Sequence, residues 1–178
     1  MKALLGLAAA AVLALTAGGI KAALPGAQTG PEPAEGTTTQ VRVTAVVDVD
    51  TLRVETLDGR QLGRVRLLGI DAPEVVHPPE PAECYAAAAT NLLERLAPVG
   101  STVELVTDTA QPSRDRYDRL LRYVDHDDGG HRIDVARELL ASGAARRYEA
   151  DQALAREESY SVATDDAQAA GRGLWGNC

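Results

Sequence analysis

The chain has 178 residues, which is enough for one domain with a hydrophobic core. Its 26 acidic residues outnumber 18 lysines and arginines, so the formal net charge is −8. This balance excludes nucleic-acid binding through a generally basic surface, and any such binding needs a local basic patch together with a metal ion. Every basic side chain after Lys21 is an arginine, the residue best suited to bidentate contacts with phosphate.

The N-terminal part of the chain differs in composition from the rest. Residues 1–23 begin with Met1 and Lys2 and continue as an apolar run, which is typical of a secretory signal peptide or of an uncleaved membrane anchor. Residues 24–39 are rich in proline, glycine and threonine and predict a linker. We therefore expect one domain over 40–178, either secreted or anchored at the cell surface, with membrane contact only through the N-terminal segment.

The pattern of apolar residues predicts a mixed α+β domain. Alternating branched residues at 41–47 predict a first strand, and the runs 51–57 and 62–70 around Asp58-Gly59 predict a hairpin. Further strands are predicted at 102–107 and 120–124, the latter closed by an acidic turn over 125–130, and helices at 83–96, 133–141 and 154–170. Five strands and three helices in this order suit a five-stranded OB-fold β-barrel.

Four carboxylates are expected to converge at one end of the hairpin. Asp50 opens its first strand and Asp71 closes its second, while Asp48 and Glu74 flank these two positions. Clustered carboxylates repel one another and imply a hard cation with oxygen ligands, either calcium or magnesium. Arg66, which lies in an apolar run, indicates an anion nearby. The alternative is that these acids only cap strand ends and turns and that the arginine forms a surface ion pair.

Three segments together resemble the staphylococcal nuclease family. They cover residues 48–74, 114–124 and 167–175, and their order and spacing match the family over about 40–178. The resemblance implies an OB-fold hydrolase that requires Ca2+, cleaves DNA and RNA with little sequence preference and leaves 3′-phosphates. A monomer is expected. The alternative is a catalytically weak or silent OB-fold module that binds nucleic acid at the cell surface.

The resemblance also implies roles for individual residues. The implied catalytic residues are Glu74, which orients or deprotonates the attacking water, and the arginines Arg66 and Arg119. The implied metal ligands are Asp50, Asp71, the backbone carbonyl of Ala72 and, through a water molecule, Asp48. The implied substrate-binding residues are Arg116 and Tyr117. An intact trio of catalytic residues favours the enzyme over the binding module.

Two positions depart from the family, and Tyr148 is a further candidate. Val49 and Asp118 stand where the family has glycine. The valine would shift the metal loop if that glycine has a positive φ, and Asp118 would compete with substrate phosphate for Arg119. Tyr148 follows the second predicted helix and could stack on a base, the alternative being a packing role at the barrel edge.

The chain contains two cysteines, Cys84 and Cys178. Two cysteines in an exported domain usually pair, the alternative being two unrelated thiols. Secreted bacterial members of the resembled family also carry cysteine pairs at these two places. We expect a disulfide that holds the C-terminal tail and lies away from the site residues.

Overall fold

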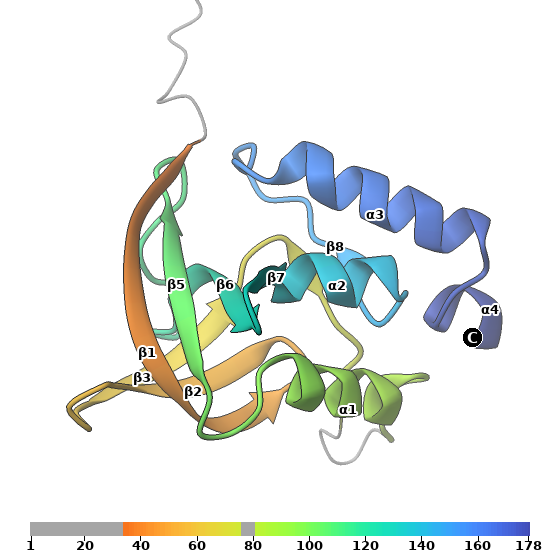
Figure 1. Ribbon diagram of the computed structural model, residues 1–178. Helices are drawn as coiled ribbons and strands as arrows, with labels where there is room; N and C mark the ends of the chain where they lie inside the picture. The colour runs from red at the N-terminus through yellow and green to blue at the C-terminus, as the bar shows by residue number, and fades with distance from the viewer. Residues whose placement is uncertain (1–33, 76–80) are drawn as a thin grey trace, which may run out of the picture.

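The computed structural model describes residues 34–75 and 81–178, so the predicted signal or anchor lies outside the described residues. Strands form a curved sheet, and the helices lie to one side of it (Figure 1). The strands are β1 (Glu35–Asp48), β2 (Thr51–Thr56), β3 (Gln61–Leu67), β4 (Ile70–Asp71), β5 (Thr102–Asp108), β6 (Leu120–Asp128), β7 (His131–Asp134) and β8 (Arg146–Arg147). The helices are α1 (Ala86–Leu96), α2 (Val135–Ala141), α3 (Glu157–Ala169) and α4 (Leu174–Asn177).

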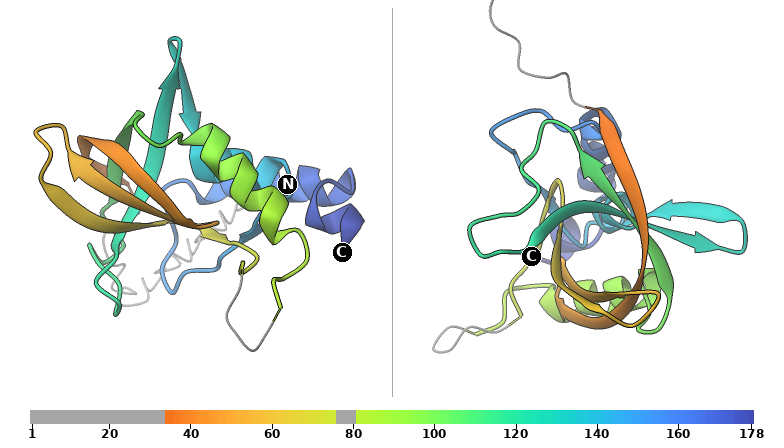
Figure 2. Two further views of the ribbon diagram at one scale, coloured as in Figure 1. Left: turned by 90° about the horizontal axis from the view of Figure 1, so that it is seen from below. Right: turned by 90° about the vertical axis from the view of Figure 1, so that its left-hand side faces the viewer.

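The main sheet has the strand order β3-β2-β1-β5-β6-β7. β3 also pairs in parallel with β6, where Val65 lies opposite Leu120, and this pairing brings the two ends of a five-stranded sheet together. Five strands thereby curl into a partly open barrel, as the right-hand view of Figure 2 shows. The predicted α+β class and OB-fold are confirmed.

β1 connects the two halves of the barrel because it pairs with both β2 and β5. The register with β2 shifts between Val43 and Ala45 and again just before Asp48, which marks β-bulges that bend the strand. β1 begins at Glu35, so the last residues of the linker predicted over 24–39 belong to the sheet instead.

The segment between β6 and α2 differs most from the prediction. The expected acidic turn over 125–130 is a longer β6 that reaches Asp128 and returns as β7. Gly129 and Gly130 both have positive φ, at 64° and 93°, as a tight hairpin turn requires. α2 therefore begins only after this hairpin, at Val135.

The helices pack their apolar faces onto the barrel and onto one another. α1 turns Ala86, Ala89 and Leu93 inward at helical spacing, and α2 packs against α3 and β6. The predicted starts of α1 and α3 were both too early, because Tyr85 and Arg156 are the residues that precede these helices. Within the described residues, no helix is long and apolar enough to cross a membrane.

A buried polar cluster joins α3 to the barrel, and we call it the Arg156 cluster. Its centre is Arg156, whose Nη1 and Nη2 donate to Asp125 at 2.6 and 2.8 Å. Nη1 also donates to Asp134 at 2.9 Å and Nε to Glu35 at 2.8 Å. The guanidinium lies over the ring of Tyr123, 4.4 Å from its centroid. These contacts connect β1, β6 and β7 to the start of α3.

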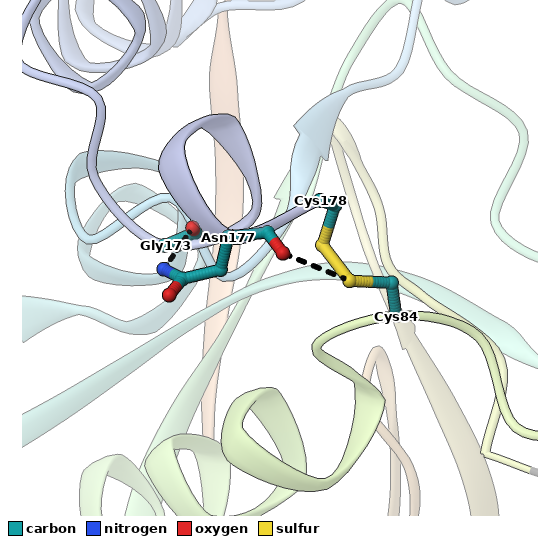
Figure 3. The surroundings of a disulfide bond; sticks show 4 residues. All are labelled: Cys84, Gly173, Asn177 and Cys178. Atoms are coloured by element: carbon teal, nitrogen blue, oxygen red, sulfur yellow. Dashed lines mark hydrogen bonds between the residues drawn. A yellow bond between two sulfur atoms is a disulfide. The ribbon is translucent and has the colours of Figure 1, made fainter.

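The C-terminal tail is attached to the body by a disulfide and by close backbone packing. Cys84 and Cys178 are bonded, with their Cα atoms 6.0 Å apart, so the predicted bridge is confirmed (Figure 3). The N–H of Leu174 donates to the carbonyl of Gly143, and a Cβ on that glycine would lie 2.1 Å from the carbonyl oxygen of Arg172. The tail can dock this closely only because glycine stands at the contact.

Candidate active site

One arginine and two carboxylates meet at the end of the β2–β3 hairpin. Thr51 pairs with Arg66 across the hairpin, which sets Asp50 beside the guanidinium. Arg66 Nη2 lies 3.1 Å from Asp50 Oδ2 and 4.0 Å from Asp71 Oδ1. Its Nη1 donates to the carbonyl of Leu67 at 2.7 Å, which orients the side chain. The structure thus brings Arg66, Asp50 and Asp71 together, as the sequence predicts.

Asp50 lies where its negative charge is only partly compensated. Burial raises the pKa of its carboxyl group and Asp48 raises it further, whereas Arg66 and the Thr51 hydroxyl, which donates at 2.8 Å, act in the opposite direction. A cation beside this carboxylate would offset the unfavourable burial of its charge.

The oxygen atoms at this end of the hairpin fit a hard cation. Asp50, Asp71 and the carbonyl of Ala72 are the donor types that calcium takes. No three His, Cys, Asp or Glu side chains within residues 34–75 and 81–178 are grouped to hold a metal. A bound cation would therefore depend on two carboxylates, one carbonyl and water molecules.

Val49 fits the loop between the two acids without strain. Val49 is buried, and its backbone φ is not positive, unlike that of Tyr85 or Asp118. The structure therefore does not support the expected shift of the metal loop at Val49. Asp48 accepts a hydrogen bond from the Val49 N–H at 2.9 Å, which leaves it near Asp50 and turned toward its own backbone.

Arg119 reaches the same site from the start of β6. Its backbone N–H and its Nε donate to the two carboxylate oxygens of Asp115, at 2.9 and 2.7 Å. Nη1 lies 3.4 Å from the Thr51 hydroxyl oxygen, which links Arg119 to the residue that bonds Asp50. Arg66 and Arg119 therefore reach two neighbouring residues, since Arg66 contacts Asp50 and Arg119 contacts Thr51.

The sequence reasoning assigned no role to Asp115, although it is the residue that orients Arg119. Burial opposes ionisation of Asp115, but the hydrogen bonds from Arg119 and Tyr117 outweigh burial and lower the pKa of its carboxyl group. The signal for this role is its position four residues before the arginine, at the start of a turn.

Asp118 does not compete for Arg119. Its carboxylate pairs with Arg114 at 3.2 Å, and its side chain is 86% exposed. Its φ is 62°, the left-handed region that glycine adopts without cost, so the glycine of the resembled family is explained by the backbone. The expected competition with phosphate at this position is not supported by the geometry.

A cleft of about 560 Å3 lies beside the two arginines. The predicted substrate-binding residues line it together with the arginines, namely Arg66, Arg116, Tyr117, Arg119 and Tyr148. Both tyrosines are about half exposed, at 55% and 52%. Two exposed rings beside cationic side chains form a suitable surface for a base and a phosphate. The sequence alone left the register of Tyr148 open, and the structure places it in this cleft.

Glu74 lies outside the residues that line this cleft. Its side chain is exposed, and its backbone N–H and carbonyl both form hydrogen bonds with Glu83. The Glu74 N–H donates to Glu83 Oε2 at 3.2 Å, and the Glu83 N–H donates to the Glu74 carbonyl at 2.9 Å.

The disulfide is closer to the site than expected. Asp71 and Ala72 line a second cavity, of about 430 Å3, together with Cys84 and Cys178. The expectation that the bridge lies away from the site residues was therefore wrong. It came from the position of the cysteines in the sequence, which does not show that the tail folds back onto the loop after β4.

Comparison with known proteins agrees with this architecture. The family model described as "Staphylococcal nuclease homologue" matches residues 64–177. The chain belongs to the staphylococcal nuclease family. A thermonuclease of Staphylococcus intermedius is 35% identical over 117 residues, which cover 63% of this chain and 67% of that protein. An uncharacterised endonuclease of Escherichia coli O157:H7 is 33% identical over 137 residues, 75% of each chain.

A third similar protein is an uncharacterised protein of Methanocaldococcus jannaschii. It is 34% identical over 122 residues, which cover 60% of this chain but only 58% of that protein. The staphylococcal nuclease match includes the end of β3 with Arg66, the turn with Arg119 and the tail with its short helix, whereas Asp48 and Asp50 precede it.

Proposed function

We propose that this protein is a calcium-dependent nuclease that hydrolyses phosphodiester bonds of DNA and RNA with little sequence preference. The main support is that Arg66 and Arg119 reach the neighbouring residues Asp50 and Thr51, at the end of the hairpin beside the cleft. Family membership adds to this support, because the similar proteins of Staphylococcus intermedius and Escherichia coli are named as nucleases.

The two arginines would stabilise the transition state. In-line attack of water on phosphorus places negative charge on the non-bridging oxygens, and guanidinium donors aimed at that charge lower the barrier. Arg66 approaches from β3 and Arg119 from the turn before β6, so they would contact different oxygens of one phosphate. Calcium, when bound by Asp50, Asp71 and the carbonyl of Ala72, would supply further positive charge to the phosphate.

Glu74 would accept the proton of the attacking water. The new bond joins the water oxygen to phosphorus, the P–O5′ bond breaks with its electron pair on O5′, and O5′ takes up a proton from solvent, so the products are a 3′-phosphate and a 5′-hydroxyl. Asp48 would act one step removed, through a water molecule. The support for this role is that Glu74 stands three residues after Asp71, where the resembled family has its general base, and a carboxylate is chemically suited to that task.

Substrate binding would combine stacking with a few charged contacts. Tyr117 and Tyr148 each present a ring to the cleft, and stacking is worth about 1–3 kcal/mol per base. Arg116, whose Cζ lies 4.7 Å from the centroid of the Tyr117 ring, would bind a terminal phosphate. Because this binding would depend on a few arginine contacts with phosphate, it should weaken as the salt concentration rises, in proportion to the number of phosphates neutralised.

We further propose that the protein acts outside the cytoplasm as a monomer, secreted or held at the cell surface by residues 1–23. The disulfide supports this location, since such bonds persist in oxidising compartments. Periplasmic or secreted protein should give one bonded species under non-reducing alkylation.

The proposal is tested by incubating the full chain with single-stranded DNA in millimolar calcium or in excess chelator. We expect cleavage only with calcium, and products that carry 3′-phosphate. Binding without cleavage under both conditions would instead favour an OB-fold module that only binds nucleic acid.

The metal site is tested separately by calorimetry. With few protein ligands, affinity for calcium should be weak, in the millimolar range. The double variant Asp50→Asn with Asp71→Asn should lose this binding, while Asp58→Asn, an exposed acid at the hairpin turn, should retain it. Unchanged calcium affinity in the double variant would place the ion elsewhere.

A further inference from the structure

Glu83 and Glu74 form a two-point contact that connects the proposed general base to the start of α1. One hydrogen bond runs from the Glu74 N–H to the Glu83 carboxylate, and the other from the Glu83 N–H to the Glu74 carbonyl, at 3.2 and 2.9 Å. The first depends on the side chain of Glu83, so it can be removed by substitution without disturbing the second.

Glu83 is itself fixed by the turn that leads from it into α1. Its carbonyl accepts from the Ala86 N–H at 3.1 Å, which forms this turn. Within the turn Tyr85 has a φ of 73°, an unfavourable value for a non-glycine residue, and its side chain packs against the hydrophobic core. Such a conformation persists only where the surrounding structure determines it.

The disulfide attaches this turn to a rigid support. Cys84 directly follows Glu83 and is bonded to Cys178 at the end of α4 (Figure 3). α4 is in turn fixed to the body, because Leu174 is buried and its N–H donates to Gly143. Glu83 and Cys84 also line the cavity that contains Asp71 and Ala72.

We propose that Glu83 is a positioning residue for Glu74, and that the Cys84–Cys178 bridge holds Glu83 in place. This inference rests on the proposed function, since it concerns how the general base is aimed. Small displacements of a catalytic group are costly, because the reacting atoms must stay in near-attack geometry. The contact therefore matters for turnover more than for stability.

The test compares Glu83→Ala with Glu83→Gln in the full chain. The glutamine keeps an oxygen that can accept from the Glu74 N–H, whereas alanine removes it. We expect kcat of Glu83→Ala to fall about tenfold with little change in KM, and Glu83→Gln to stay close to the wild type. Glu94→Ala, an exposed glutamate on α1, is the matched control and should have no effect.

The bridge is tested by the double variant Cys84→Ser with Cys178→Ser, assayed well below its melting temperature. Its kcat should fall by a similar factor, and adding Glu83→Ala should then cost less than it does in the wild type, because both changes release the same contact. Multiplicative effects of the two changes would contradict the proposed link.

Amide hydrogen exchange at Glu74 gives a readout that does not depend on catalysis. Exchange should be slow in the wild type and faster in Glu83→Ala. Unchanged exchange, or an active wild type whose kcat is unaffected in Glu83→Ala, would overturn the positioning role while the proposed nuclease function stands. An inactive wild type would contradict the proposed function itself.

Discussion

Arg119 and Arg156 are both held by carboxylates, but their surroundings differ. Arg156 is 11% exposed, and its Nε, Nη1 and Nη2 all donate to acids. Arg119 is 23% exposed and lines the cleft. The Nε of Arg119 donates to Asp115, and its Nη1 lies near the Thr51 hydroxyl. In the part of the chain that the structure describes, the Nη2 of Arg119 forms no hydrogen bond.

This difference distinguishes an arginine that stabilises the fold from an arginine that can bind a ligand. An arginine whose three nitrogen atoms all donate to carboxylates has little capacity left for a ligand, and Arg156 serves to attach α3 to the barrel. An arginine that is oriented by one acid and keeps a donor at a cleft can bind a phosphate. The same residue type thus has two roles, which can be told apart by counting the donors already in use.

The largest effect on folding is expected for Arg156→Met. The change leaves Asp125, which is 2% exposed, and Asp134 with fewer charge partners, and breaking such a buried network costs about 3–5 kcal/mol. Urea unfolding should show this loss, whereas the folded fraction should bind substrate as before. Arg137→Met, at an exposed arginine of α2, is the control and should change stability by about 0.5 kcal/mol or less.

A pH-dependent effect is expected for Asp125→Asn. Burial opposes ionisation, but hydrogen bonds from Arg156 and Arg132 outweigh it and lower the pKa of Asp125. The unfolded carboxyl titrates near pH 4 and binds protons before the folded one does, so the stabilisation is present above about pH 4 and lost as the pH falls further. The difference in unfolding free energy between wild type and variant should shrink accordingly in acid.

Asp134→Asn serves as the contrast, because the pKa of Asp134 is raised whereas that of Asp125 is lowered. Burial raises the pKa of Asp134 despite Arg156, so its ionisation becomes unfavourable to folding as the pH rises above about 4. Asparagine can still cap α2 by accepting from the Arg137 N–H. At neutral pH this variant should therefore lose less stability than Asp125→Asn, and an equal loss would contradict the assignment.

The smallest effect is expected for Asp118→Gly. Glycine relieves a φ of 62°, while an exposed ion pair with Arg114 is lost, so the two contributions nearly cancel. Turnover should stay within about twofold of wild type, because Asp115 orients Arg119. Asp115→Asn should lower turnover by about tenfold instead. A large gain of activity in Asp118→Gly would show that Asp118 does compete with substrate.

The sequence predicts the hairpin end and its acids because the turn at Asp58-Gly59 is local and fixes which strand ends meet. The disulfide could also be predicted, since only two cysteines are present. The Arg156 cluster could not, because Glu35, Asp125 and Arg156 come from elements far apart in the chain. Neither could the Glu74–Glu83 contact, which depends on a side chain nine residues further along the chain.

The boundaries of elements failed for a similar reason. Acidic residues at the end of β6 favour a turn locally, but pairing with β7 extends the strand to Asp128. The domain start was predicted at residue 40 because the first part of β1 has a polar composition that resembles a linker. A domain that began there would lack Glu35, which belongs to the Arg156 cluster. In both places tertiary contacts outweigh local propensity.

The most direct test of the proposed active site is the turnover of Arg66→Ala, Glu74→Gln and Arg119→Ala, each measured in calcium on single-stranded DNA. We expect each variant to lose about 10²–10³-fold in kcat, the usual effect of removing one such catalytic group, while its melting temperature stays close to that of the wild type. Rates like the wild type in all three folded variants would contradict the claim that this hairpin end and its cleft form the active site.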